Sequence, residues 1–274
     1  MNEYLGATPL PPTTAGTALR LHAFHGGGEL ADMATFDPFG PGVGTQVEVP
    51  FFFYLVEHAA GLVLFDSGGH PDLVDDPVGR LGAAAEDFEV QMAPGDDVVS
   101  RLATIGVAPG DVQHVAHSHL HYDHAGGIEF FPEATFYAQR RELEFAHWPP
   151  VYQRGLYVRA DFDHPVTWRE LAGEYDVFGD GSVVLFPTPG HTAGHQSMLV
   201  RLPSQTIILV ADAAYLPRNI EERVLPGIVW SPDAMVASWD RIEAIRHRTN
   251  ARLIFTHDLD WPTTARLAPG ASYE

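Results

Sequence analysis

The chain has 274 residues and a formal net charge of -20, from 36 acidic and 16 basic side chains, and every basic residue is an arginine. An excess of negative charge of this size repels phosphate backbones and anionic lipid surfaces, so we expect no nucleic-acid partner and no membrane partner. The chain has no cysteine, which excludes disulfides, thiolate metal sites and a cysteine nucleophile.

The start of the chain carries no recognisable targeting segment. It lacks the basic segment followed by an apolar run that marks a secretory signal, and no apolar run is long enough to cross a bilayer, so we expect a cytoplasmic protein. Residues 1–18 are rich in Pro, Thr, Ala and Gly and are predicted to form a loosely held N-terminal arm. Residues 19–274 are predicted to form a single domain, and the sequence leaves open whether the chain forms a homodimer.

The first predicted element is a strand over 19–24, which the run His25-Gly26-Gly27-Gly28 is expected to break. A long loop over 25–45 follows, and loops of this length inside a compact domain often act as lids. The apolar runs 47–56 and 62–65 predict the two strands of a hairpin.

A predicted helix over 97–105 and a predicted strand over 112–116 then lead into a cluster of histidines. Beyond this cluster the sequence favours a strand over 134–138 and a helix over 140–147, followed by an irregular stretch over 148–181 that is a second candidate lid. The remaining predicted elements are strands over 182–186, 197–201 and 206–210, an amphipathic helix over 232–247 and a last strand over 252–255. This order of strands and helices favours two sheets between helical layers.

The cluster runs from Ser118 to Gly127 and has the pattern H-x-H-x-D-H. Imidazole and carboxylate are the ligands that a borderline divalent ion such as zinc selects. Several other predicted strands also end in such residues, and strand ends can converge on one edge of a sheet. The candidate ligands are His119, His121, Asp123, His124, His191, Asp212 and His257. This set is larger than one tetrahedral zinc ion needs, and it suits two ions that share a carboxylate.

The motif S-H-L-H-Y-D-H-A-G-G, together with T-P-G-H-T-A-G-H over 188–195, D-A-A-Y over 212–215 and T-H-D over 256–258, resembles the metallo-β-lactamase superfamily. The resemblance covers about residues 50–258, and more narrowly it is to the N-acyl homoserine lactone lactonases. It implies an α/β protein with the four-layer αββα sandwich of that superfamily.

The resemblance also implies a role for each candidate ligand. His119, His121 and His191 would hold one metal ion. The other ion would be held by Asp123, His124 and His257, and Asp212 would bridge the two. Tyr215 would contact the carbonyl of the substrate as a catalytic residue.

The implied function is hydrolysis of the lactone ring of N-acyl homoserine lactones, which is quorum quenching, by a hydroxide that bridges two metal ions. We expect zinc at both positions, with cobalt, manganese or iron as alternatives, because the same nitrogen and oxygen ligands accept them. Asp123 is expected to shuttle a proton to the leaving alkoxide as well as to bind metal. The sequence leaves open a lactonase for another small lactone, such as 4-pyridoxolactone or γ-butyrolactone. A glyoxalase II-like thioesterase and a non-hydrolytic metal or redox protein on the same fold are further alternatives.

Two residues outside the ligand set are expected to support it, with Asp66 accepting a hydrogen bond from a ligand imidazole and His195 packing behind the site. An acyl chain needs apolar walls near the metal ions, and Phe52, Trp148 and Trp230 are the candidates for them. The sequence does not fix the preferred length of the acyl chain.

Overall fold

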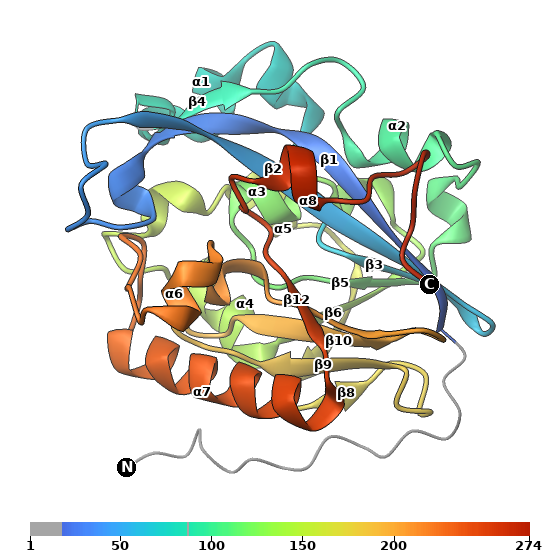
Figure 1. The fold of residues 1–274 in the computed structure, drawn as a ribbon. Helices are drawn as coiled ribbons and strands as arrows, with labels where there is room; N and C mark the ends of the chain where they lie inside the picture. The colour runs from blue at the N-terminus through green and yellow to red at the C-terminus, as the bar shows by residue number, and fades with distance from the viewer. Residues whose placement is uncertain (1–17, 87) are drawn as a thin grey trace.

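Two β-sheets pack face to face between layers of helices in this protein, as a computed structural model that describes residues 18–86 and 88–274 shows (Figure 1). The predicted αββα sandwich in a single domain is therefore confirmed. The expected N-terminal arm, apart from its last residue, lies outside the described residues.

Within the described residues, the first sheet has seven strands in the order β4-β1-β2-β3-β5-β6-β7. Strands β1 and β2 form a long antiparallel pair, whereas β3, β5, β6 and β7 are parallel neighbours. The strands are β1 (Ala18–Asp32), β2 (Gln46–His58), β3 (Gly61–Phe65), β4 (Glu89–Gln91), β5 (His114–Ala116), β6 (Thr135–Gln139) and β7 (Thr167–Leu171).

The second sheet has five strands in the order β12-β11-β10-β9-β8, again counting the described residues. Strands β9 and β11 run in the same direction because both are antiparallel to β10, and β12 is parallel to β11. The strands are β8 (Tyr175–Asp176), β9 (Val183–Pro187), β10 (Gln196–Arg201), β11 (Thr206–Leu209) and β12 (Arg252–Ile254).

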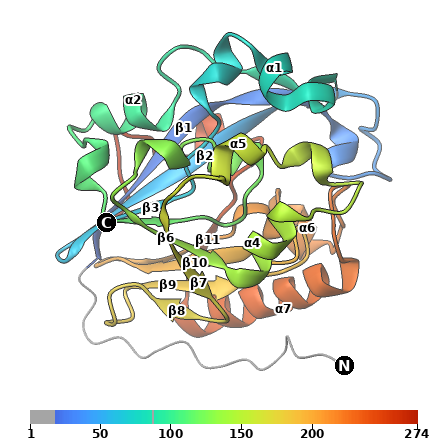
Figure 2. The ribbon, with the colours of Figure 1, turned by 180° about the vertical axis from the view of Figure 1, so that it is seen from behind.

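Helices cover the outer face of each sheet, with α2, α4 and α5 over the first sheet and α6 and α7 over the second (Figure 2). The α-helices are α1 (Pro77–Leu81), α2 (Val98–Ala103), α3 (Tyr122–Ala125), α4 (Arg140–His147), α5 (Arg159–Phe162), α6 (Pro217–Glu221), α7 (Pro232–Thr249) and α8 (Trp261–Thr264). Short 3-10 helices are η1 (Met33–Thr35), η2 (Pro71–Val74), η3 (Gly82–Glu86), η4 (Pro109–Asp111), η5 (Ile128–Phe130), η6 (Arg154–Leu156) and η7 (Ala211–Ala213). In the part of the chain that is described, no helix has the length and apolar character needed to span a bilayer.

Side chains alternate along the strands between two separate cores. In β9, Val183 and Leu185 face the other sheet, whereas Val184 packs against α7. The same alternation holds in β2, where Tyr54 faces the other sheet and Leu55 faces the helices. Strands buried on both faces appear in the sequence as continuous apolar runs, which explains why their positions could be predicted.

The expected break of the first strand at His25–Gly28 is wrong. Strand β1 continues to Asp32, and the pairing with β2 shifts by one residue between His25 and Gly28, as in a β-bulge. Glycine is required there because a Cβ on Gly28 would lie 2.3 Å from the carbonyl oxygen of Val49. The irregular stretch expected over 148–181 is also partly wrong, since it contains α5, β7 and β8.

The parallel strands end at one edge of the sandwich, and this places the candidate ligands. Strand β5 leads into His119 and His121, β9 into His191, β11 into Asp212 and β12 into His257. The backbone is bent sharply at two of these ends, since Asp66 after β3 and Ala211 after β11 have φ of 61° and 49°. Side chains at rigid strand ends hold a fixed geometry better than side chains on loops.

Candidate metal centre

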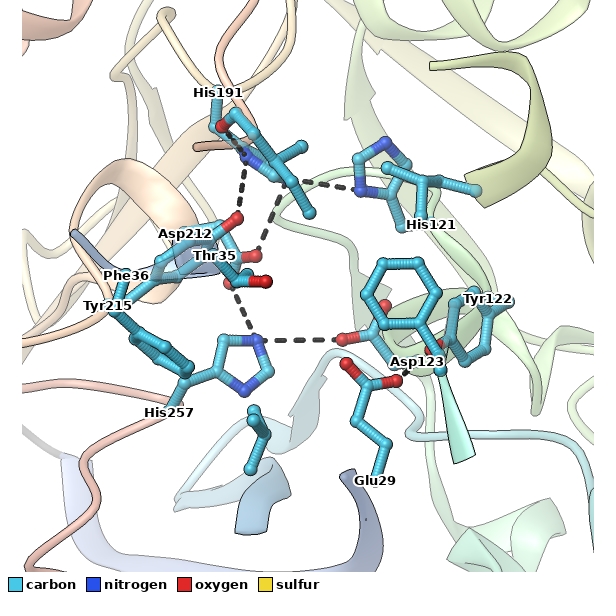
Figure 3. A pocket seen from close by; sticks show the side chains of 14 residues that line it. Glu29, Thr35, Phe36, His121, Tyr122, Asp123, His191, Asp212, Tyr215 and His257 are labelled. Carbon is cyan, nitrogen blue, oxygen red and sulfur yellow. Dashed lines mark hydrogen bonds and ion pairs between the residues drawn. The ribbon is translucent and has the colours of Figure 1, made fainter. Parts of the chain in front are cut away.

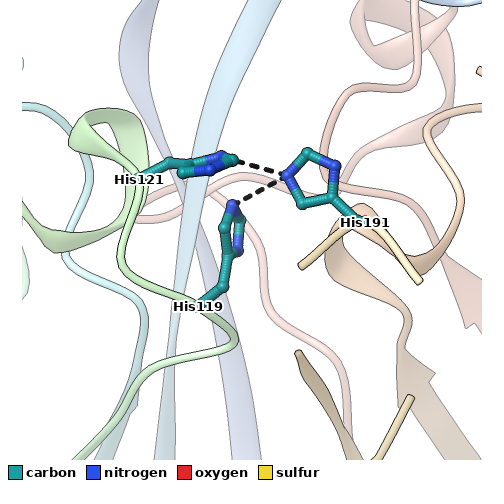
Figure 4. Close-up of side chains that lie close together, drawn as sticks. All are labelled: His119, His121 and His191. Carbon is teal, nitrogen blue, oxygen red and sulfur yellow. Dashed lines mark hydrogen bonds between the residues drawn. The ribbon is translucent and has the colours of Figure 1, made fainter. Parts of the chain in front are cut away.

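His119, His121 and His191 converge on a common point, as their rings in Figure 4 show. The Nε2 atom of His191 lies 3.0 Å from Nδ1 of His121 and 3.1 Å from Nε2 of His119. All of these rings are buried. The structure thus brings together the three histidines predicted to hold one ion.

A second cluster consists of Asp123, His124 and His257. The Oδ2 atom of Asp123 lies 3.1 Å from Nε2 of His124 and 3.5 Å from Nε2 of His257. Asp212 lies between the two clusters. Its Oδ2 is 3.4 Å from Nε2 of His191, and its Oδ1 is 3.3 Å from Nε2 of both His124 and His257. One carboxylate therefore presents an oxygen to each cluster.

In His191 and His257, the ring nitrogen that faces away from the clusters shows that the other ring nitrogen carries a lone pair. Nδ1 of His191 lies 3.0 Å from the carbonyl oxygen of Ile228, and Nδ1 of His257 lies 2.8 Å from the carbonyl oxygen of Pro50. A carbonyl can only accept, so both Nδ1 atoms carry the proton, and a neutral imidazole then has its lone pair on Nε2. Lone pairs that converge in a buried site repel one another unless a cation lies between them, so the residues fit bound metal.

Burial and neighbouring charges shift the histidine pKa values of the two clusters in opposite directions. Burial, helped by the neighbouring histidines, lowers the pKa of His119 and His121 well below the usual value, which keeps both rings neutral. Burial would also lower the pKa of His124, but the carboxylates of Asp123 and Asp212 raise it well above its usual value. For Asp212, burial is outweighed by His257 and His124, which hold its pKa well below the usual value. Neutral imidazoles and ionised carboxylates are the protonation states that bind metal, so His119, His121 and Asp212 are ready to bind an ion, whereas His124 would give up its proton to one.

Asp66 and His195 lie directly behind the ligands. Asp66 Oδ2 is 3.0 Å from Nδ1 of His124, and Asp66 Oδ1 accepts a 2.6 Å hydrogen bond from the backbone N–H of Ser118. The ring of His195 packs 5.4 Å from that of His119. Nδ1 of His195 lies 2.9 Å from Oγ1 of Thr188, and burial lowers the pKa of His195 to about 3. His195 therefore stays neutral and acts as a packing residue.

Glu142 on α4, which was not predicted as a site residue, holds the two ligand loops together. Its buried carboxylate accepts hydrogen bonds from the backbone N–H of Leu120 at 3.1 Å and from Oγ1 of Thr192 at 2.6 Å. It also accepts from the hydroxyl of Tyr157 at 2.8 Å and from the N–H of Gly194 at 3.2 Å. A glutamate on a short polar helix gives no sign in the sequence of being buried.

A pocket with an empty volume of ≈ 360 Å³ opens onto both clusters (Figure 3). Its polar lining includes His121, Asp123, His191, Asp212 and His257. Its apolar lining is Phe36, Val49, Phe88, Leu156 and Ile228. Phe36 comes from the expected loop 25–45 and Leu156 from the stretch 148–181, so both segments supply walls to this pocket.

Tyr215 also lines this pocket, with its hydroxyl 3.2 Å from Nδ1 of His191. Burial, together with Asp212 and Asp123, raises the pKa of Tyr215 well above its usual value, so the phenol stays protonated. Nδ1 of His191 carries a proton, which the carbonyl oxygen of Ile228 and the hydroxyl oxygen of Tyr215 share, so Tyr215 does not donate there and keeps its own O–H for another acceptor.

Two further polar residues of the pocket, Glu29 and Tyr122, were not among the residues singled out from the sequence. The hydroxyl of Tyr122 donates a hydrogen bond to Oε2 of Glu29, and both side chains are buried. Burial and then the nearby Asp123 raise the pKa of Glu29 to about 8. The expected break at His25–Gly28 concealed Glu29, because it removed the rest of β1 from the sheet.

The three aromatic residues expected to form the acyl-chain wall do not line this pocket. Phe52 faces the core between the sheets and lines a different cavity with Tyr54 and Trp261. Trp148 is 85% exposed. The ring of Trp230 lies under the guanidinium of Arg141 at 4.9 Å. Aromatic character alone does not tell which face of a strand or loop a side chain occupies, and the alternation along β2 turns Phe52 away from the metal centre.

The sequence matches the metallo-beta-lactamase superfamily over residues 52–257, which include both clusters. Among solved structures, a similar one is an N-acyl homoserine lactone hydrolase with the product N-hexanoyl-L-homoserine bound at its catalytic metal centre. It superimposes with a TM-score of 0.85 at 26% sequence identity, and the match covers 93% of this chain and 99% of that chain.

Relatives of this chain indicate which family within the superfamily it belongs to. An N-acyl homoserine lactonase, AttM, of Azorhizobium caulinodans is 38% identical over 84% of this chain and 89% of its own length. The N-acyl homoserine lactonase AiiA of Bacillus thuringiensis subsp. kurstaki is 28% identical over 82% of this chain and 88% of its own length. The chain belongs to the metallo-β-lactamase superfamily and, within it, to the family of N-acyl homoserine lactonases.

Proposed function

We propose that this protein is a metal-dependent lactonase that opens the lactone ring of N-acyl homoserine lactones and so quenches quorum sensing. The observation that carries the proposal is the position of Asp212, whose two oxygens face two different histidine clusters beside the free hydroxyl of Tyr215. Further support comes from the relatives that bear this activity in their names.

His119, His121 and His191 would hold one divalent ion, and Asp123, His124 and His257 the other, with Asp212 shared between them. When bound, two such ions supply a water nucleophile of lowered pKa and Lewis-acid stabilisation of developing negative charge. Zinc is the favoured ion, and cobalt, manganese or iron suit the same ligands.

The residues of the pocket would orient the lactone and handle its protons. The neutral phenol of Tyr215 donates a hydrogen bond to the lactone carbonyl oxygen, which stabilises the charge that develops there as water attacks. Asp123 lines the same pocket and is placed to receive the proton of the attacking water. As the ring C–O bond breaks, this proton passes to the leaving oxygen, which becomes the alcohol of the N-acyl homoserine product. Phe36, Leu156 and Ile228 exclude water around the acyl chain.

The test is lactone hydrolysis by protein of measured metal content, followed by proton release. N-acyl homoserine lactones with short and long acyl chains are compared with γ-butyrolactone. Fast turnover of the acyl homoserine lactones with about two ions per chain, as a shared-carboxylate site requires, is the expected result. Two ions without this activity would refute the substrate assignment, and fewer than two ions in active protein would refute the dinuclear site.

A further inference from the structure

The pocket has a polar wall opposite the ligand histidines, formed by Glu29 and Tyr122. Glu29 lies on β1 beyond the bulge, directly across from Val49 of β2, and both residues line the pocket. Its side chain is buried, and Figure 3 shows its carboxyl pointing into the pocket toward Asp123.

One of the two oxygens of Glu29 has a partner within the chain. The hydroxyl of Tyr122 donates to Oε2, which fixes the orientation of the carboxyl, and Oε1 is left to face the pocket. A carboxyl group keeps acceptor capacity in either protonation state. A ligand that fills the pocket would bury Oε1, and a buried acceptor without a donor is unfavourable, so a ligand that brings a donor to Oε1 is favoured over one that does not.

The surroundings restrict the kind of donor that fits. Val49 lies directly across from Glu29, and Phe36 and Phe88 line the same pocket. The nearest charged groups are Asp123, His257 and Asp212, which belong to the metal centre. The hydrogen-bond donor that Glu29 has within the described residues is Tyr122, on Oε2, so a donor for Oε1 can come from the ligand. An N-acyl homoserine lactone carries one polar hydrogen, the amide N–H, on the ring carbon next to the lactone carbonyl.

We infer that Glu29 is a specificity-determining residue that accepts a hydrogen bond from the amide N–H of the substrate through Oε1 while Tyr122 holds Oε2. This role of Glu29 rests on the proposed lactonase function. It makes Glu29 and Tyr122 the residues that give the enzyme a preference for lactones with an acylamino group. Lactones of the same size without a donor at that position would leave Oε1 unpaired and would be poorer substrates.

The experiment compares two matched substrates: N-hexanoyl homoserine lactone and its carba analogue, in which CH₂ replaces the N–H. Both are assayed by ring opening with the metal-loaded wild-type protein and with Glu29→Leu, Glu29→Gln and Tyr122→Phe. Glu48→Gln is the matched control, because Glu48 is an exposed carboxylate on the neighbouring strand. The dissociation constant of the product N-hexanoyl-L-homoserine and the metal content are measured for each protein.

The wild-type protein should prefer the amide substrate. Glu29→Leu should lower kcat/KM for the amide about 10-fold, as expected from the loss of one hydrogen bond, and weaken product binding to a similar extent. The same variant should change kcat/KM for the carba analogue by less than about threefold, with metal content unchanged. Glu29→Gln keeps an acceptor oxygen and should retain most of the preference, and Tyr122→Phe should lose part of it.

An equal loss for both substrates in Glu29→Leu would overturn the inference, because it would indicate a merely structural role. A wild-type protein that opens both lactones equally well would also overturn it while the lactonase function stands. A wild-type protein with full metal content that opens neither lactone would refute the proposed function itself.

Discussion

Three imidazoles of the candidate metal centre are oriented through the ring nitrogen that faces away from the clusters. The carbonyl oxygens of Ile228 and Pro50 and the carboxylate of Asp66 fix the rings of His191, His257 and His124 respectively. Partners of this kind set the tautomer as well as the angle of the ring, and so direct a lone pair toward the ion. The ligand residues and Asp66 could be predicted from the sequence, but the other two partners could not, because they are backbone carbonyls of distant segments.

Tyr215→Phe should lower kcat for acyl homoserine lactones about tenfold, because the carbonyl oxygen loses one hydrogen-bond donor while Lewis-acid stabilisation remains. Metal content and the dissociation constant of the product should change little. Steady-state kinetics on metal-loaded protein provide the measurement, and Tyr152→Phe, at a tyrosine that is 65% exposed, serves as the control. Unchanged kcat in Tyr215→Phe would remove this hydroxyl from the mechanism.

Among the elements, α7 supports the segment of Asp212 from behind. Trp239 is completely buried in the core between α7 and the second sheet, and its Nε1 donates a hydrogen bond to the carbonyl oxygen of Ala213, next to Asp212. Gly190 at the end of the neighbouring loop packs so closely on α7 that a Cβ there would lie 2.4 Å from the Cα of Met235. The helix therefore holds two of the ligand segments in place.

Trp239→Ala should lower the free energy of unfolding by about 3–5 kcal/mol, since it leaves a large cavity in this core. Urea denaturation of the metal-loaded protein measures the loss. Val236→Ala on the same helix, at a position that is 36% exposed, should cost less than about 1 kcal/mol. If Trp239→Ala also lost less than about 1 kcal/mol, the packing of Trp239 between α7 and the second sheet would not stabilise the fold as expected.

Asp161 on α5 forms an ion pair with Arg80 on α1. This buried carboxyl should make the free energy of unfolding depend on pH. Burial raises the pKa of Asp161 to about 6, although Arg80, His70 and His164 act in the opposite direction. A carboxyl whose pKa is higher in the folded state stabilises the fold fully below its unfolded pKa and loses this contribution as pH rises through about 6.

The free energy of unfolding of Asp161→Asn should therefore rise relative to that of the wild-type protein by up to about 3 kcal/mol as the pH goes from 4 to 7. Arg80 keeps Asp72 as a partner at 3.2 Å, so the substitution does not leave the guanidinium unpaired. Urea denaturation of both proteins across this range tests the effect. Parallel stability profiles would contradict it.

How well an element could be predicted depended on how deeply it is buried. Strands such as β11 and β9, buried on both faces, gave clear apolar runs at the predicted positions. Strand β7 is an edge strand with three exposed residues among Thr167–Leu171, so its sequence has no such pattern. The glycines in β1 predict an end of the strand, whereas in the fold they allow a bulge where two backbones approach closely.

At the scale of the whole molecule, a large negative charge and a ligand set of carboxylates and buried imidazoles make bound metal a source of stability. A ligand that binds the folded state at 100 to 1,000 times its dissociation constant stabilises it by about 2.7–4.1 kcal/mol. Removal of metal with a chelator should therefore lower Tm by roughly 5–15 °C in a chain of this size.

Thermal unfolding before and after chelation, and again after addition of zinc or manganese, measures this effect. The Asp212→Ala variant serves as the comparison, because it lacks the carboxylate shared by both clusters and should respond weakly to added metal. An equal Tm with and without metal in the wild-type protein would contradict the assignment of these residues as ligands.

The buried carboxylate of Glu142 has a consequence for the way this protein acquires its ions. It joins the loop that carries His119 and His121 to the loop that follows His191 through hydrogen bonds within the chain. These hydrogen bonds use none of the ligand atoms, so the fold itself holds the two loops of the first cluster next to each other. Loading can then follow synthesis, and one ion can replace another without unfolding, so the resident metal will reflect which ions the surroundings supply as much as which ions the ligands prefer.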